Sequence, residues 1–231
     1  MGTRIAKFLS SASVASRRDA EKMIVGGLVS INGKIITNPA TFVSDTDVVC
    51  VNGQQVKKQY DTKLYMFHKP INIITSKQDT LGRKTIYDVL PNEYKHLKYI
   101  GRLDYKTTGL LLLTNDGEFA RNLTLPCVGI SRTYIAQVGG NLKNIDVARR
   151  GVKIDGVQYR PMKIDVLEKN KLAITVTEGK KNEIRIVLKY CGAPVEKLHR
   201  ISYGNIKLGD LPVGKIKELD KKTIDAIKKN F

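Results

Sequence analysis

The sequence predicts an α+β protein: a small N-terminal domain with two helices and a small sheet, followed by a larger domain with a mixed, mainly antiparallel sheet and flanking helices. Three observations support this. Apolar residues recur at helical spacing near the N-terminus, two Asn-Gly turns follow, and the rest alternates short apolar strand candidates with helix candidates. A chain of 231 residues is long enough for two domains with real cores.

Two helices are expected at the start. Residues 5–12 place apolar side chains at helical spacing, and a second helix is predicted to begin at Ser16, which caps it, with Asp19 in the first turn. Gly26-Gly27 ends this helix, because glycine adopts the left-handed conformation without steric strain.

The small sheet is predicted from turn signals. Asn32-Gly33 and Asn52-Gly53 favour the type I′ turns that suit the twist of paired strands. The polar and basic stretch 54–63 reads as a linker. The domains are therefore predicted as residues 1–60 and 61–231.

The second domain begins with a strand candidate at 64–67, which Lys69-Pro70 turns. Asn72 tolerates left-handed backbone, so this turn is expected to hold. Further strands are predicted at 110–113, 133–138 and 172–177, and helices at 117–123, at 141–150, between Asn182 and Gly192, and in the lysine-rich tail 215–231.

Composition indicates an anionic partner. The chain has 40 Lys+Arg against 22 Asp+Glu and a formal net charge of +18. Nucleic acid is the first candidate for such a partner. The alternative is a solvated basic surface without a specific partner.

Other classes of protein find little support. No apolar run approaches the roughly 18–20 residues that cross a bilayer, so no membrane partner is expected. The three cysteines and three histidines are scattered, which predicts no metal site and no disulfide framework. Isolated cysteines are typical of a reduced, cytoplasmic protein.

The most informative stretch runs from Gly101 to Gly117. It reads as a loop, a buried strand and a turn, with Asp104 in the loop between Arg102 and Lys106. Loops on a rigid scaffold often carry chemistry. Such an aspartate can equally be a turn former that bonds to its own backbone.

This stretch, G-R-L-D-x-x-T-x-G-L-L-L-L-T-N-D-G, resembles the signature of the RsuA/RluB family of ribosomal RNA pseudouridine synthases. The resemblance implies that Asp104 is the catalytic residue. It extends over nearly the whole chain, since the N-terminal domain resembles the S4 RNA-binding domain. The family's Lys-Pro-x-Gly motif is also present, with Asn72 in place of the glycine.

Arg185 lies in the first turn of its predicted helix, where the helix dipole disfavours a cation. Such a cation needs an anionic partner, and the resemblance implies that this partner is Asp104. The alternative is a local pair with Glu183 or Glu178. Relatives often carry a second basic residue next, where this chain has Ile186.

The resemblance assigns two more residues to the base. Tyr134 of the Arg-x-Tyr motif would stack on the target base, and Leu198 would close on it from another side. On pattern alone both would be core residues. Arg102 would contact substrate or brace the loop, and the sequence leaves both open.

The resemblance to the S4 domain also implies RNA contacts on or beside the first two helices. The basic residues there can share a face through i, i+3 and i+4 spacing, or they can simply be solvated. The predicted RNA-binding residues are Arg4, Lys7, Arg17, Arg18 and Lys22.

The implied function is site-specific isomerisation of uridine to pseudouridine in ribosomal RNA, by a monomer without cofactor or metal. The motifs favour large-subunit over small-subunit RNA. A non-catalytic S4-type RNA-binding or ribosome-assembly protein is the alternative. A nuclease would need paired carboxylates or metal ligands, which the sequence does not offer.

Overall fold

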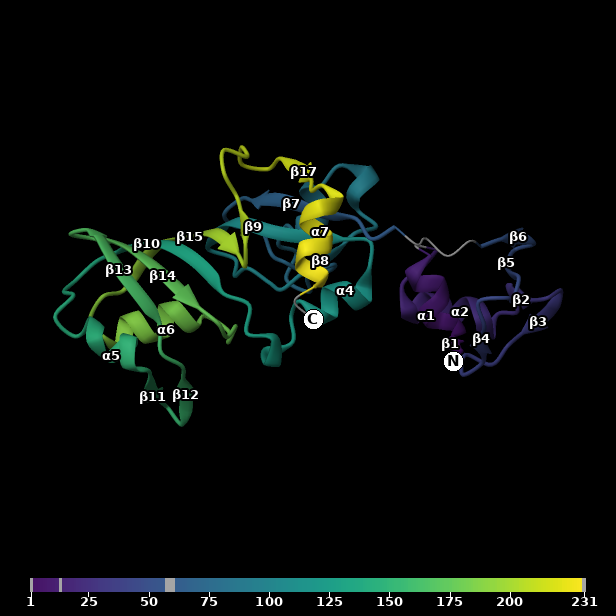
Figure 1. Cartoon of the computed structure of the whole chain (residues 1–231), viewed down its shortest axis with the longest axis horizontal. Coiled ribbons are helices and arrows are strands. Elements are labelled where there is room, and N and C mark those ends of the chain that lie inside the picture. The colour runs from purple at the N-terminus through teal and green to yellow at the C-terminus, as the bar shows by residue number, and fades with distance from the viewer. Residues whose placement is uncertain (1, 13, 57–60, 230–231) are drawn as a thin grey trace. The chain divides into compact units, whose positions relative to one another are not determined.

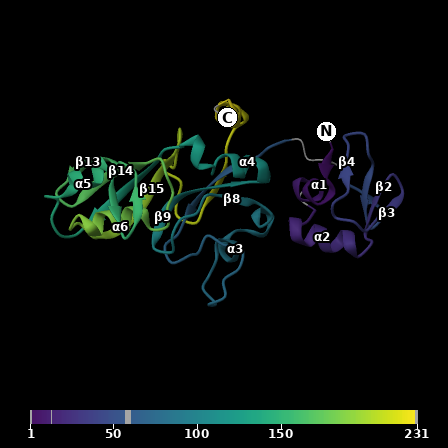
Figure 2. The same ribbon diagram turned by 90° about the horizontal axis from the view of Figure 1, so that it is seen from below.

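The computed structural model describes residues 2–12, 14–56 and 61–229, and the chain divides into two compact units (Figures 1 and 2). One unit contains the residues up to Lys63 together with Asn115–Gly117. The other contains Leu64–Thr114 and the residues from Glu118 onwards. The predicted α+β class is confirmed.

The first unit packs two helices against small sheets. Val29, Val49 and Val51 of the sheet and Ile5, Leu9 and Ile24 of the helices are buried in one core. β1 pairs with β4, and the other sheet has the order β3-β2-β5-β6. The elements are β1 (Thr3–Arg4), α1 (Ile5–Ser11), α2 (Arg17–Val25), β2 (Val29–Ile31), β3 (Lys34–Ile36), β4 (Phe42–Val43), β5 (Val49–Val51) and β6 (Gln54–Gln55).

Local signals in the sequence explain these elements. The Ser16 hydroxyl accepts a hydrogen bond of 3.2 Å from the Asp19 N–H, which confirms the predicted cap of α2. Asn32 and Asn52 have φ of 50° and 49°, and a glycine with positive φ follows each, as type I′ turns require. The second turn pairs β6 with β5, so the sheet extends into the predicted linker, whose residues 57–60 lie outside the described residues.

The second unit is built on one nine-stranded sheet with the main order β13-β14-β10-β15-β9-β7-β17. β16 pairs with β15 and β8 with β9, and β15 and β9 run parallel while the other pairs are antiparallel. Its strands are β7 (Leu64–Lys69), β8 (Lys98–Ile100), β9 (Thr107–Thr114), β10 (Arg132–Val138), β13 (Lys163–Glu168), β14 (Lys171–Val176), β15 (Val195–Tyr203), β16 (Ile206–Lys207) and β17 (Ile216–Glu218).

Helices and short elements surround this sheet (Figure 1). They are α3 (Ile86–Val89), α4 (Gly117–Asn122), α5 (Ile145–Arg150), α6 (Glu183–Tyr190) and α7 (Lys221–Lys228), two 3-10 turns at Asn92–Tyr94 and Pro126–Val128, and a hairpin of β11 (Val152–Ile154) and β12 (Val157–Tyr159). No helix in the described part of the chain combines the length and apolarity of a membrane span.

The four consecutive leucines of β9 are buried because both faces of this strand are covered. Leu111 and Leu113 belong to the core beneath α6, whereas Leu110 and Leu112 belong to the core beneath α4 and α7. A strand covered on both faces reads as an unbroken apolar run. The central position of β9 fixes the loop that precedes it, which contains Asp104.

Two helix predictions are corrected. The helix predicted at 141–150 begins only at Ile145, because the Asn141 side chain accepts a hydrogen bond from the Lys143 N–H and closes a turn. The tail 215–231 is not one helix: β17 pairs with β7 first, and α7 then starts at its Asp220 cap.

Gly109 of β9 is the point of closest backbone approach in the sheet. Its φ is +105°, and an added Cβ would lie 2.3 Å from the Arg200 carbonyl oxygen of β15. Gly129 also has a positive φ, +61°, but an added Cβ there would meet nothing within 4 Å. Comparing substitutions at these two glycines therefore distinguishes the effect of a steric clash from that of backbone strain.

We expect Gly109→Ala to lower the free energy of unfolding by about 2–5 kcal/mol, through left-handed strain plus the clash with β15. Gly129→Ala should lower it by only about 1–2 kcal/mol, since strain acts alone there. Urea denaturation of the full chain measures both. Equal losses would show that the contact between Gly109 and Arg200 contributes nothing.

Candidate active site

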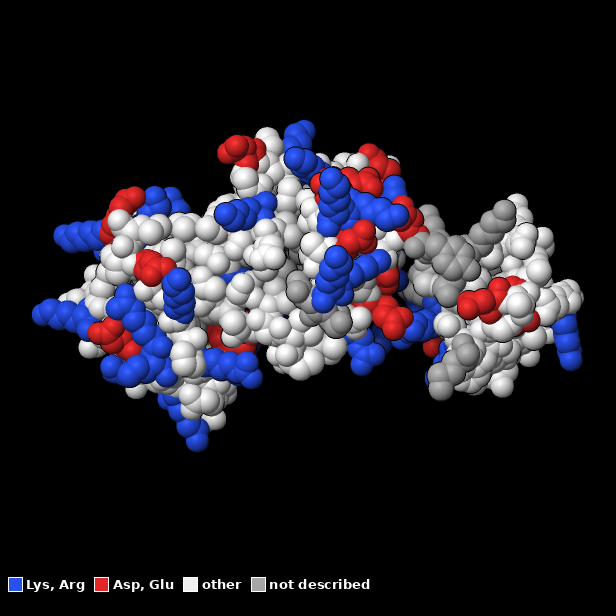
Figure 3. Space-filling view, viewed as in Figure 1, with Lys and Arg blue, Asp and Glu red and all other residues white. Residues whose placement is uncertain are grey.

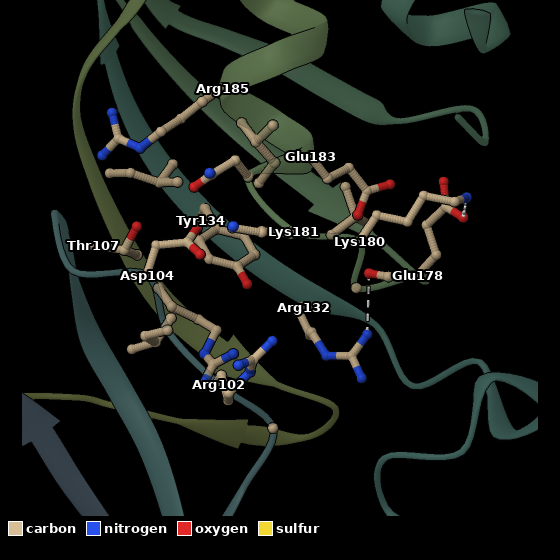
Figure 4. Close-up of a pocket in the computed structure, with 18 of the residues that line it drawn as sticks. Arg102, Asp104, Thr107, Arg132, Tyr134, Glu178, Lys180, Lys181, Glu183 and Arg185 are labelled. Atoms are coloured by element: carbon tan, nitrogen blue, oxygen red, sulfur yellow. Dashed lines mark hydrogen bonds and ion pairs between the residues drawn. The ribbon is translucent and has the colours of Figure 1, made fainter. Parts of the chain in front are cut away.

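A pocket of about 240 Å³ opens in the second unit between the Asp104 loop (residues 103–107), β10, β15 and the start of α6. All five residues predicted for the reaction line this pocket, although the chain separates them widely. They are Arg102, Asp104, Tyr134, Arg185 and Leu198. Figure 4 shows Asp104 and Tyr134 among the side chains that line this pocket.

The Asp104 loop is held by its backbone. Five consecutive carbonyl groups, those of residues 103–107, each accept a hydrogen bond. The donors are, in order, the Thr75 hydroxyl, the Thr107 N–H, the Asn72 N–H, the Arg185 guanidinium and the Lys69 ammonium. The half-buried Asp104 carboxylate is therefore positioned by its backbone, and its own oxygens accept no hydrogen bond from the described residues.

Asn72 confirms one expectation on this loop. Its φ is 59°, so the asparagine does adopt the left-handed backbone expected of the Lys-Pro turn. That conformation lets its N–H donate to the Tyr105 carbonyl at 2.9 Å. The residue at the position of the family's glycine thus supports the Asp104 loop directly.

Arg185 corrects a prediction. Its guanidinium donates to the carbonyls of Val195 and Lys106, at 2.9 and 3.0 Å, and no direct ion pair with Asp104 is formed among the described residues. The local pair with Glu183 or Glu178 is likewise not formed there. Burial lowers the pKa of Arg185, and the negative charge of Asp104 opposes this shift. Arg185 thus ties the loop to β15 while its charge still acts on Asp104.

Two buried cations near Asp104 were not predicted as site residues. Lys69 is fully buried, and its ammonium donates to the carbonyls of Pro70 and Thr107, each at 2.9 Å. Arg200 is 1% exposed and lines the pocket, with its Nε bonded to the Leu110 carbonyl at 2.7 Å. The only signal in the sequence was their place within family motifs, beside residues with assigned roles.

Tyr134 and Leu198 form the apolar side of the pocket. They are 8% and 5% exposed, so each is also a core residue, as the pattern alone suggested. The Arg200 guanidinium lies 6.0 Å from the centre of the Tyr134 ring, within the range of a cation–π contact. A buried cation therefore supports the tyrosine.

Arg102 is exposed at the pocket, and among the described residues it has no hydrogen-bond partner. It does not brace the loop, and its guanidinium is free to meet a ligand. Together, a carboxylate, a flat ring, an apolar wall and several cations suit a planar uncharged base attached to an anionic backbone.

In the first unit, three of the five predicted RNA-binding residues come together. Arg4, Lys7 and Arg17 line an open pocket of about 590 Å³ beside Phe42, which is 58% exposed. Arg18 and Lys22 are exposed on α2 but do not line this pocket, and Lys22 lies 4.0 Å from Asp19.

Comparison with known proteins identifies both units. The RNA pseudouridylate synthase family matches residues 63–190, and the S4 domain matches residues 3–49. An RNA pseudouridine synthase of Rickettsia typhi is 40% identical over 98% of this chain and 96% of its own length. The chain therefore belongs to the RNA pseudouridylate synthase family, and its class of activity is that of a pseudouridine synthase, an isomerase.

Two further relatives agree along nearly the full length. The ribosomal large subunit pseudouridine synthase B of Bacillus subtilis is 36% identical over 94% of this chain and 91% of its own. A crystal structure of a pseudouridylate synthase has a TM-score of 0.69 and 26% identity, covering 96% of this chain and 98% of that one.

Lys69 gives a direct test of the charge at Asp104. Burial lowers the pKa of Lys69 to about 8. The negative charge of Asp104 opposes this shift, and the positive charge of Arg200 adds to it. We expect Asp104→Asn to lower the pKa of Lys69 further, because the substitution removes the anion that favours the ammonium. A carbon-13 NMR titration of the lysine side chains measures it.

Asp165→Asn is the control, since Asp165 is exposed on β13. This substitution should leave the pKa of Lys69 unchanged. A pKa of Lys69 that does not move in Asp104→Asn would contradict the electrostatic coupling.

Proposed function

We propose that this protein converts uridine to pseudouridine in large-subunit ribosomal RNA, with the Asp104 carboxylate as the catalytic group. The observation that carries the proposal is the hydrogen-bonded loop that places Asp104 in the same pocket of about 240 Å³ as Tyr134. Preorganisation of this kind is what a catalytic group needs and a turn-forming aspartate does not.

The reaction is an isomerisation. The bond between N1 of uracil and C1′ of ribose breaks, the base turns, and a bond between C5 and C1′ forms. C5 then loses its proton and N1 takes one up, so the composition is unchanged. An ionised carboxylate can act as nucleophile or as base toward the ribose. Tyr134 and Leu198 would hold the detached base between them, and stacking on the ring contributes about 1–3 kcal/mol.

A paired uridine cannot reach such a pocket, so the enzyme must take it from a loop or flip it out of the helix at a cost of about a few kcal/mol. Basic side chains appear over α5, the β11–β12 hairpin and α7 on the face that Figure 3 shows, with acidic ones among them. Arg102 at the pocket and the basic residues of the S4 domain would hold the RNA for this step.

The large-subunit target is supported by the Bacillus subtilis relative, which is 36% identical and is named a ribosomal large subunit pseudouridine synthase. Small-subunit RNA is the alternative target. A purely RNA-binding role is disfavoured, because binding through the S4 domain alone would not require a carboxylate and a tyrosine in one pocket of the other unit. We further expect the enzyme to act as a cytoplasmic monomer without metal.

We expect the purified protein to form pseudouridine in large-subunit ribosomal RNA, and Asp104→Asn to slow this by at least about 10²–10⁴-fold. New pseudouridines are mapped after incubation with each ribosomal RNA in turn. RNA binding should persist in the variant, since the basic surface is unchanged. If Asp104→Asn modifies RNA at the normal rate, the assignment is wrong.

We expect Arg17→Ala and Arg18→Ala each to weaken RNA binding similarly for all sequences. Each should also reduce the slope of log affinity against log salt by about one, because a phosphate contact and its released counterion are lost. Lys34→Ala on β3, away from the two helices, is the control. RNA affinity measured from low to high salt tests this prediction. Unchanged slopes of log affinity against log salt would contradict the predicted RNA-contacting face.

A further inference from the structure

A basic rim closes one side of the active-site pocket. It consists of residues 178–182, between β14 and α6, and contributes Lys180 and Lys181 to the pocket lining. Figure 4 shows both lysines on the α6 side of the pocket. A nucleotide in the pocket would bring its phosphates near these cations.

The rim is fastened through Glu178. Its Oε1 accepts a hydrogen bond of 2.7 Å from the Arg160 N–H, at the end of β12, and its Oε2 is paired with the Lys180 ammonium. Its backbone carbonyl accepts a hydrogen bond of 3.1 Å from Arg132 of β10. Glu178 therefore connects Lys180 of the rim to Arg132 of β10 and to Arg160 at the end of β12.

Glu183 lies behind the rim in the first turn of α6. It is 5% exposed, lines the pocket, and contacts Glu178 through a carboxyl–carboxyl hydrogen bond. Its Oε1 is buried without a hydrogen-bond partner among the described residues. An unpaired charge in such a place is strongly unfavourable.

A single proton resolves this conflict. Burial raises the pKa of Glu183 to about 8, and the hydrogen bond and negative charge of Glu178 add to this shift. The backbone N–H and the positive charge of Lys180 oppose it. Although burial opposes it, hydrogen bonds from Glu183, Arg160 and Lys180 hold the pKa of Glu178 below its usual value. At neutral pH the proton therefore resides on Glu183, which donates it to the Glu178 carboxylate.

We propose that Glu183 is a positioning residue for RNA binding: the proton it shares with Glu178 holds the basic rim in place, and its loss releases the rim. This rests on the proposed function, because the rim is argued to face the RNA. Arg185, on the same helix, takes no part, since its guanidinium is bonded to the carbonyls of Val195 and Lys106.

The direction of the pH effect follows. Below pH 8 the pair carries one negative charge and one hydrogen bond. Above pH 8 Glu183 ionises, two carboxylates face each other, and the contacts of Glu178 to Lys180 and Arg160 weaken. RNA affinity should then fall as pH rises, with KM affected more than kcat.

The test measures the dissociation constant of a large-subunit ribosomal RNA transcript of Bacillus subtilis between pH 6.5 and 9. The full chain carries Asp104→Asn, so that no reaction occurs during the measurement. Each variant is compared with its own value at pH 6.5. We expect the dissociation constant to rise about fivefold across this range, the size of repulsion between nearby charges.

Glu183→Gln keeps the shape and the hydrogen-bond donor but cannot ionise, so its dissociation constant should rise less than that of the parent. Glu178→Gln removes the charge that keeps Glu183 protonated, so its rise should begin at lower pH. A rise in Glu183→Gln equal to that of the parent would overturn the proposal and point to another group, such as Lys69.

A carbon-13 titration of the Glu183 carboxyl gives an independent readout if a variant does not fold. A pKa near 4 would overturn the proposal. Pseudouridine formation by the unsubstituted enzyme at pH 7 tests the proposed function separately. An active enzyme with a level dissociation constant in the parent would refute the positioning role alone.

Discussion

The active site depends on the hydrogen bonding of one short backbone segment. Every carbonyl from residue 103 to residue 107 has a donor, and these donors come from β7, the turn after it, α6 and the loop itself. A carboxylate placed in this way needs no partner for its own oxygens. It can therefore remain half-exposed and available to a substrate while its position is fixed by the sheet.

The same arrangement explains why long cationic side chains are buried or half-buried here. Lys69 and Arg185 use their N–H groups to bind carbonyl oxygens of the loop, which offsets part of the cost of burial. Their positive charges then lie close to Asp104, as the opposing effects on their pKa values require. One set of side chains thus supplies both the geometry of the loop and the electrostatic environment of the carboxylate.

The sequence pattern predicted those features of the fold that depend on interactions between residues close together in the chain. The Ser16 cap and the Asn-Gly turns followed from residue type. The motif around Asp104 drew attention to a loop that does line the pocket. The roles of Lys69 and Arg200 could not be predicted, because each binds a carbonyl far away in the chain, that of Thr107 or Leu110. The pairing of Arg185 was predicted wrongly for a related reason: charge suggested a carboxylate partner, whereas the fold places two backbone carbonyls within reach.

The pocket carries an excess of positive charge, which indicates how RNA would be recognised. With Glu183 protonated, Asp104 and Glu178 are its anions, and they face a larger set of cations: Arg102, Arg132, Lys180, Lys181, Arg185 and Arg200. Such a set repels itself until an anion enters, and the phosphates beside the target nucleotide would supply that charge. Phosphate attraction does not distinguish bases, so in the proposed function the choice of uridine falls to the apolar side of the pocket, where Tyr134 and Leu198 lie.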